Sequence, residues 1–175
     1  MSRGVRFAPL LLLALIVAAL VWRLARPVDT SVHSALEGKP VPMFALPSAL
    51  PGKAALSTSD LATGRPRIVN VFASWCVPCV TEVKVLQQLK AEGVTVDGIA
   101  VRDRPEDLAE FLARNGDPYE RIGSDVQSRV QIALGSSGVP ESFIVDGAGI
   151  IRYQHIGPIE RGDVPLILAR LEQSR

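Results

Sequence analysis

The chain has only two cysteines, Cys76 and Cys79, which form one Cys-x-x-Cys motif directly after Trp75. The motif lies between a strand-like apolar run and the first turn of an amphipathic segment. At a helix N-terminus, free N–H groups and the helix dipole favour an anion, so we expect a stabilised Cys76 thiolate. Cys79 follows one turn later and should be more shielded. The pair is therefore suited to disulfide exchange, in which Cys76 attacks a partner disulfide and Cys79 resolves the mixed disulfide.

A metal site is the main alternative for a cysteine pair. Such sites usually have about four ligands, whereas the chain adds only two histidines, His33 and His155. We therefore predict no metal site and no cofactor besides the redox-active disulfide. A purely structural pair is also disfavoured, because the flanking Trp75 and the intervening Pro78 have no obvious packing role at an exposed turn.

Two further residues have chemistry that depends on where the fold places them. Pro140 directly precedes an expected strand, and a proline there can adopt the cis peptide bond that presents backbone groups to a bound chain. Glu82 follows Cys79 by three residues, one turn along the expected helix. By residue type alone the favoured interpretation of Glu82 is an ordinary solvated helix charge, since Glu is rarely buried.

The elements around the motif must position it. Arg67 to Phe72 is a nearly continuous apolar and β-branched run, typical of a central strand buried on both faces. From Pro78 to Glu92 apolar residues recur at helical spacing, and Gly93 ends that helix. The pattern then predicts a strand at 94–101, a helix at 105–116, a short strand at 119–122 and a short helix at 126–134.

The last part of the chain has a different pattern. Residues 142–145 and 150–155 flank the turn sequence Asp146-Gly147-Ala148-Gly149, which predicts an antiparallel hairpin. Asp163 then caps a closing helix. The order βαβα followed by ββα predicts an α/β fold with a mixed central sheet and helices on both faces.

Length and charge narrow the possible functions. The 175 residues are about one domain plus a terminal appendage. Lys and Arg number 19 and Asp and Glu 18, and no basic run follows the first 30 residues. Nucleic-acid binding is therefore not expected.

The N-terminal segment predicts a membrane anchor. Phe7 to Ala25 is almost wholly apolar and has close to the ~20 residues that a helix needs to cross a bilayer. Cleaved signal peptides have shorter apolar regions and a small-x-small cleavage site, which 24–27 matches poorly. We predict an uncleaved signal-anchor over 1–26, a tether over 27–42 and a folded domain over 43–175.

Flanking charge does not decide the orientation of this anchor, because Arg3 and Arg6 precede the charge-free run from Phe7 to Trp22, and Arg23 and Arg26 follow it. Disulfide exchange on secreted cysteines has a use on the oxidising side of the membrane. We therefore expect the folded domain to face that side.

Several sequence blocks, taken in order, resemble one family. They are Gly38-Lys39-Pro40-Val41-Pro42, Asn70-Val71-Phe72-Ala73-Ser74-Trp75-Cys76-Val77-Pro78-Cys79 with Glu82, Gly98-Ile99, Asp117-Pro118-Tyr119, and the run from Gly138 to Gly157. In these blocks the chain resembles the periplasmic thioredoxin-like proteins of cytochrome c biogenesis, the CcmG/DsbE group. The likeness covers nearly the whole chain after the anchor.

The resemblance implies a thioredoxin fold, a cis Pro140 opposite the cysteines, and Glu82 and Glu141 near the active site. It implies a single-pass protein of the bacterial inner membrane whose domain faces the periplasm. Its function would be to reduce the haem-binding cysteine pair of apocytochrome c, or a partner thiol protein, with electrons from a transmembrane thiol carrier.

Three positions depart from related patterns. Thioredoxins proper have Asp six residues before the first cysteine, whereas this chain has Asn70, as its relatives do, which makes Glu82 the candidate for proton handling. Ser137 stands where an aromatic residue is expected, and Val83 replaces a polar residue. These two affect the expected docking groove rather than the thiol chemistry.

Other functions remain open at this point. A general periplasmic thioredoxin-like reductase of secreted proteins would differ only in its partner. A copper-delivery protein would hold metal with the cysteine pair and His155, although such carriers generally have a wider cysteine spacing. A non-catalytic binding module is disfavoured by the activated Cys76.

Overall fold

The computed structural model describes residues 12–17, 22–23 and 36–175, which fall into two compact units, 1–32 and 33–175. In the first unit, residues 12–17 and 22–23 are helical and exposed. Among the described residues, no helix combines the length and the apolar character that a bilayer crossing requires. Most of the predicted anchor over 1–26 lies outside the described residues, so the anchor stays a prediction.

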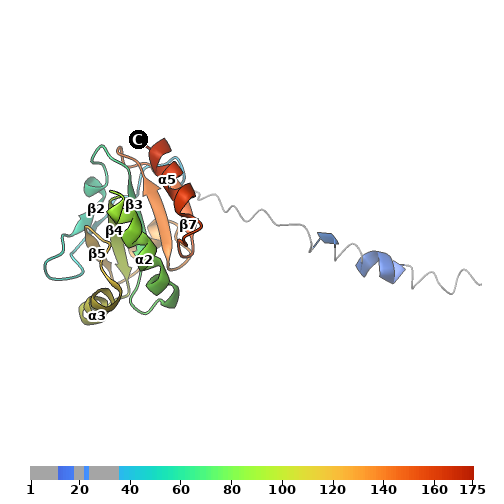
Figure 1. Ribbon diagram of the computed structural model, residues 1–175, viewed down its shortest axis with the longest axis horizontal. Coiled ribbons are helices and arrows are strands. Elements are labelled where there is room, and N and C mark those ends of the chain that lie inside the picture. Colours follow the sequence, from blue (N-terminus) through green and yellow to red (C-terminus); the bar gives the residue numbers. More distant parts are fainter. Residues whose placement is uncertain (1–11, 18–21, 24–35) are drawn as a thin grey trace, which may run out of the picture. The chain divides into compact units, whose positions relative to one another are not determined.

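The second unit is built on a five-stranded sheet with the strand order β5-β4-β3-β6-β7 (Figure 1). The central strand β3 (Arg67–Phe72) pairs in parallel with β4 (Val96–Val101) and antiparallel with β6 (Glu141–Val145). The outer strands are β5 (Ile122–Asp125) and β7 (Ile151–Ile156). The predicted mixed sheet and the β6–β7 hairpin are therefore confirmed.

Helices cover both faces of this sheet, as predicted. The long helix α2 (Val77–Ala91) packs on one face together with α3 (Pro105–Asn115) and α5 (Val164–Gln173). The other face is covered by the short helix α4 (Arg129–Ala133) and by the region around the 3-10 turn η2 (Thr58–Asp60).

The alternation of side chains along β3 assigns residues to these two faces. Ile68 and Phe72 belong to the core under α2, whereas Val69 and Val71 belong to the core under α4. Asn70 lies between Ile68 and Phe72 on the α2 side and is completely buried. A polar side chain in the middle of the central strand therefore faces the helix that begins at the cysteine motif.

The folded domain begins earlier than the predicted boundary at residue 43. The Gly38 N–H donates to the Ile151 carbonyl at 2.7 Å, and the Val41 N–H donates to the Gly149 carbonyl at 2.9 Å. Val41 is also buried. Residues 38–41 thus lie along the start of β7 and are not part of a tether. The backbone groups there supply hydrogen-bond partners for this segment.

The placement of one short strand differs from the sequence prediction. The fifth strand starts at Ile122 rather than Tyr119, and the short strands β1 (Ala45–Leu46) and β2 (Leu56–Ser57) pair antiparallel beside it. Tyr119 instead turns its side chain into the core, where its ring stacks on Phe72.

Candidate active site

Cys76 and Cys79 form a disulfide at the start of α2, with Cα atoms 5.4 Å apart. Cys76 is the N-cap residue of the helix, and the Cys79 N–H lies 3.3 Å from the Cys76 Sγ. Pro78 occupies the first turn, where a missing N–H costs no helical hydrogen bond. The expected placement of the motif at a helix N-terminus is confirmed.

The exposure of the two cysteines differs from the prediction. Both residues are buried, with Cys76 4% and Cys79 1% exposed, so the expected contrast between them is small in this disulfide form. Their neighbours are instead exposed, Trp75 by 57% and Val77 by 81%. The disulfide therefore lies at the base of an apolar rim formed by Trp75, Val77 and Pro78.

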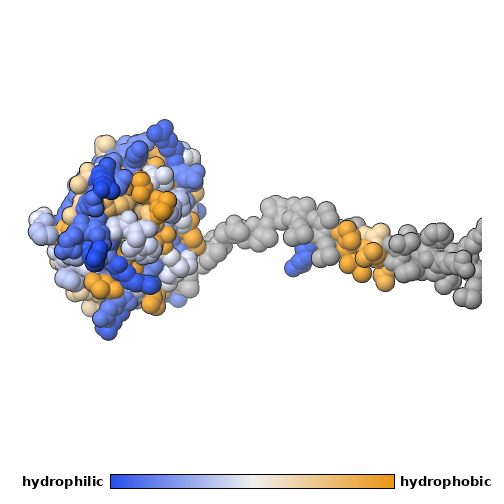
Figure 2. Space-filling view, turned by 90° about the horizontal axis from the view of Figure 1, so that it is seen from below, coloured by the Kyte–Doolittle hydropathy of each residue, from blue (hydrophilic) through white to orange (hydrophobic). Residues whose placement is uncertain are grey.

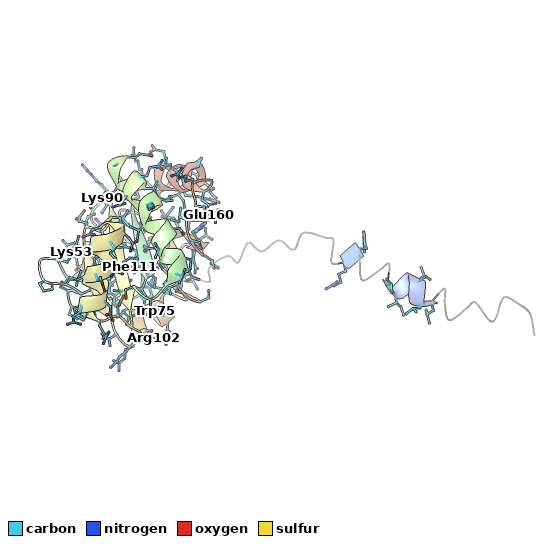
Figure 3. All side chains as sticks on the ribbon, turned by 60° about the horizontal axis from the view of Figure 1, so that its bottom comes forward. Lys53, Trp75, Lys90, Arg102, Phe111 and Glu160 are labelled. Atoms are coloured by element: carbon cyan, nitrogen blue, oxygen red, sulfur yellow. A yellow bond between two sulfur atoms is a disulfide. The ribbon has the colours of Figure 1, made fainter. Side chains whose placement is uncertain are left out.

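Asp103 holds the loop that leads into the motif. The Ser74 N–H donates to Asp103 Oδ2 at 2.6 Å, and the Ser74 hydroxyl donates to Oδ1 at 2.5 Å. Asp103 follows β4, whose carboxyl end lies beside that of β3, and Figure 3 shows Trp75 and Arg102 at the same end of the domain. The carboxylate thus joins the loops after two neighbouring strands.

Replacing Asp103 with alanine should lower the free energy of unfolding of the oxidised protein by about 2 kcal/mol, because two hydrogen bonds to a charged acceptor are lost. The matched control is Asp107→Ala, which removes an exposed ion pair with Arg104 and should have little effect. Urea titration of both variants measures the difference. Equal losses for the two variants would show that Asp103 has no special structural role.

Glu82 is buried rather than solvated, which corrects the interpretation from residue type alone. Its Oε2 accepts a hydrogen bond from Asn70 Nδ2 at 3.1 Å, and its Oε1 accepts one from the Ile159 N–H at 3.1 Å. Asn70 Nδ2 also donates to the Ser142 hydroxyl oxygen at 2.9 Å. The carboxyl therefore links α2 to two strands and to the loop after β7.

Burial raises the pKa of Glu82 from its ordinary value of 4.5 to about 7, while hydrogen bonds from Ile159, Asn70 and Ser142 oppose this rise. A group with this pKa can both accept and release a proton near neutral pH. Glu82 lies one turn after Cys79, and residues three apart on a helix are neighbours. The arrangement thus places a buried carboxyl with a raised pKa one helical turn after the inner cysteine.

The Val139–Pro140 peptide bond is cis, as the family resemblance implied. The pairing of Glu141 with Val71 places Pro140 at the end of β3 that leads to the cysteine motif. Val139 also packs against the core cluster that contains both cysteines. Pro140 therefore lies at the same end of the sheet as the disulfide.

Glu141 is buried, but strand alternation places its side chain on the α4 face of the sheet, opposite the face that Glu82 occupies. Its carboxylate accepts hydrogen bonds from the Ser137 N–H, the Ser137 hydroxyl and Gln154 Nε2. Ser137, which replaces an expected aromatic residue, thus fixes Glu141. The two acids do not form one cluster.

A groove of about 470 Å³ lies beside Trp75, between α2 and α3. Its lining includes Ser74, Val80 and Phe111, and Figure 3 shows Trp75 and Phe111 on the same side of the domain. On the face seen in Figure 2, hydrophilic side chains surround several separate hydrophobic areas. The groove is therefore a recess beside Trp75, the residue that directly precedes the cysteine motif.

The sequence patterns assign no role to Asp103, Tyr119 or Ser142. The position of Asp103 just after a predicted strand could have indicated its role, because the carboxyl ends of adjacent parallel strands meet at one edge of a sheet. The sequence predicts Tyr119 as the start of a short strand and as part of a block that carries the family resemblance, and its hydrogen bond to Asn70 spans 49 positions. No local pattern predicts such a contact.

Together, a disulfide at a helix N-terminus, a neighbouring cis-proline and a mixed five-stranded sheet define a thioredoxin-like thiol-disulfide oxidoreductase. Residues 36–171 match the Redoxin family. The chain is 40% identical over 164 residues to the thiol:disulfide interchange protein DsbE of Escherichia coli, covering 91% of this chain and 88% of that protein. The chain belongs to the Redoxin family and is a thiol:disulfide interchange protein of the DsbE type.

Other relatives agree with this assignment. The thiol:disulfide interchange protein HelX of Rhodobacter capsulatus is 36% identical over 159 residues, covering 91% of this chain and 90% of HelX. A crystal structure of a DsbE candidate from Chlorobium tepidum has a TM-score of 0.66 and 26% identity, covering 79% of this chain and 96% of that one.

Proposed function

We propose that the protein is a membrane-anchored reductase that faces the periplasm and reduces the haem-binding cysteine pair of apocytochrome c, or a partner thiol protein of cytochrome c maturation. The observation that carries the reducing role is the buried Glu82 one turn after Cys79, with its pKa raised to about 7 by burial. The substrate and the location rest on the resemblance to the CcmG/DsbE group.

The proposed reaction moves two electrons from the protein to its substrate. The Cys76 thiolate attacks a substrate disulfide, forming a Cys76–substrate disulfide and releasing one substrate thiolate, which takes up a proton. Cys79 gives its proton to Glu82 and attacks the Cys76 Sγ, which forms the Cys76–Cys79 disulfide and expels the second substrate sulfur as a thiolate, which then takes up a proton. A thiol carrier in the membrane then reduces the disulfide again.

Glu82 supports the reducing direction through electrostatics. In its ionised form the carboxylate disfavours a thiolate nearby and opposes the helix N-terminus, so the thiols should be less acidic than those of strong oxidants. When the thiolate is less stabilised, the reduced form of the Cys76–Cys79 pair is less stable and the pair is a stronger reductant. Removing the charge by Glu82→Gln should therefore make the couple more oxidising and slow the reduction of a haem-site peptide.

The rim and the cis-proline provide the proposed docking surface. Trp75, Val77 and Pro78 offer apolar contacts, and the backbone before Pro140 lies at the same end of the sheet. An extended substrate segment bound there would bring its disulfide over Cys76. Ser137, in place of an aromatic residue, leaves this surface with less ring area than we expected from the resemblance.

The test of this substrate uses the reduced full-length protein and an oxidised peptide that contains Cys-x-x-Cys-His. We expect reduction of this peptide to be at least about tenfold faster than reduction of a scrambled peptide with the same cysteine spacing, which is about 1.4 kcal/mol of discrimination. Equal rates for both peptides would favour a general periplasmic reductase.

The proposed location has its own test. A reporter that is active only outside the cytoplasm, fused after Arg175, should be active in cells that make the full chain. Deleting residues 1–26 should abolish that activity, because the proposed anchor also directs export. Reporter activity confined to the cytoplasm would overturn the proposed orientation.

A further inference from the structure

Tyr119 lies at the far end of a chain of hydrogen bonds that reaches Glu82. Its hydroxyl donates to Asn70 Oδ1 at 2.8 Å, and Asn70 Nδ2 donates to Glu82 Oε2 and to the Ser142 hydroxyl oxygen. None of these four side chains is more than 2% exposed. Each polar group therefore relies on the next one rather than on bulk water.

The position of the Tyr119 hydroxyl is fixed by contacts away from Glu82. The Tyr119 ring stacks on Phe72 with centroids 4.4 Å apart. Gly98 leaves room for this stack, since a Cβ there would lie 2.8 Å from Phe72 Cε1 and 3.0 Å from Tyr119 Cδ1. Lys53 Nζ also donates to the Tyr119 carbonyl at 2.6 Å. The hydroxyl thus serves as a fixed donor.

A fixed donor determines which way the Asn70 amide points. Burial raises the pKa of Tyr119 well above its ordinary value, so the phenol keeps a proton that needs an acceptor. The Asn70 Oδ1 supplies it, which leaves the amide NH₂ group to face Glu82 and Ser142. The opposite orientation would place Oδ1 against the carboxylate and leave the phenol proton without that acceptor.

We propose that Tyr119 is a positioning residue of the active site, which orients Asn70 as a donor to Glu82 and thereby sets how tightly that carboxyl holds the proton exchanged with Cys79. The exchange with Cys79 rests on the proposed function, whereas the orientation of Asn70 does not. Without the hydroxyl, the amide can rotate, its bond to the carboxylate weakens, and Glu82 binds its proton more tightly.

Few other groups near Glu82 could change its proton affinity, so a change in Tyr119→Phe can be attributed to the Tyr119–Asn70–Glu82 hydrogen bonds. Among the described residues, no ion pair reaches Glu82, and its polar partners are Asn70, Ser142 and the Ile159 N–H. The other groups that can titrate or carry charge on this side include the cysteine pair on α2 and, on β7, His155, which pairs with Ser142 and lies 3.8 Å from Asp163. Tyr153 on β7 also packs against this core, with Arg170 over its ring, and Lys53 pairs with Asp117 beside Tyr119. Glu160 and Arg161, near Ile159, are exposed.

The experiment follows the Glu82 carboxyl by ¹³C NMR in the oxidised full-length protein, with Glu82→Gln to assign its signal. In Tyr119→Phe we expect the proton affinity of Glu82 to rise about three- to tenfold, as one buried hydrogen bond would produce. The matched control is Tyr153→Phe, the same change at the only other tyrosine, which should leave the titration unchanged. An unchanged Glu82 titration in folded Tyr119→Phe would overturn the proposal.

A double-mutant cycle tests whether Tyr119 acts through Asn70. Asn70→Ala should raise the proton affinity of Glu82 at least as much as Tyr119→Phe, and the double variant should show no further rise beyond Asn70→Ala. Fully additive effects would overturn the proposal.

The reduction potential separates this inference from the proposed function. We expect the potential of Tyr119→Phe to differ from that of the wild type most strongly near pH 7, where the Glu82 proton is exchanged. A shifted Glu82 titration with wild-type potentials in both Tyr119→Phe and Glu82→Gln would support the positioning role and overturn the proposed role of Glu82 in thiol exchange.

Discussion

Replacing Cys79 with serine should turn the protein into a trap that holds substrates as mixed disulfides through Cys76. Cys76 is the N-cap residue of α2, where the helix terminus stabilises a thiolate, so it should be the attacking thiol. Without Cys79 the mixed disulfide has no intramolecular route to resolution. We expect peptide reduction by this variant to fall at least about a thousandfold, with the adduct visible by mass spectrometry of the non-reduced protein.

The matched control is Cys76→Ser, which keeps one thiol in the same motif. It should be equally inactive but should form no adduct, because the remaining Cys79 lies inside α2 and not at the N-cap position, where the helix terminus stabilises a thiolate. If Cys76→Ser traps the peptide and Cys79→Ser does not, the two roles are reversed.

The second large effect concerns the pH dependence of stability. Between pH 4.5 and about 7 the unfolded chain releases the Glu82 proton while the folded domain keeps it, because burial raises the folded-state pKa to about 7. The folded state then binds more protons, so stability falls as the pH rises through this window and stays lowered above it. A shift of this size corresponds to about 3 kcal/mol.

Glu82→Gln removes the titrating group and should remove this part of the pH dependence. Urea unfolding of the oxidised protein at pH 4 and pH 8 measures it, with Glu106→Gln, an exposed glutamate on α3, as the control that keeps the wild-type behaviour. If the Glu82→Gln and wild-type proteins lose the same stability between these pH values, then Glu82 is not the buried acid that its surroundings indicate.

The architecture could be predicted from the sequence where the residues of one short segment are enough to identify the element that they form. The run from Arg67 to Phe72 is apolar enough to identify a central strand, and the motif after it identifies the start of α2. The hairpin follows from its turn residues. These features depend on neighbours within a few positions, so local patterns are sufficient to predict them.

The interior of the site was less predictable because long-range packing determines it. Residue type places Glu82 on a solvated face of α2, whereas the loop that contains Ile159 covers α2 on that side. The opposite faces of Glu82 and Glu141 follow from alternation along β6, but only once its register with β3 is known. The hydrogen bonds of Asp103 with Ser74 and of Tyr119 with Asn70 join residues 29 and 49 positions apart. The periodicity of apolar residues carries no information about such contacts.

The equilibrium reduction potential of the Cys76–Cys79 couple against glutathione tests the reducing role most directly. The proposed function predicts a value in the range of thiol reductants, between roughly −200 and −270 mV, because the Glu82 carboxylate opposes thiolate stabilisation at the helix N-terminus. A wild-type value near −120 mV, as oxidising as the dedicated disulfide donors, would contradict that role.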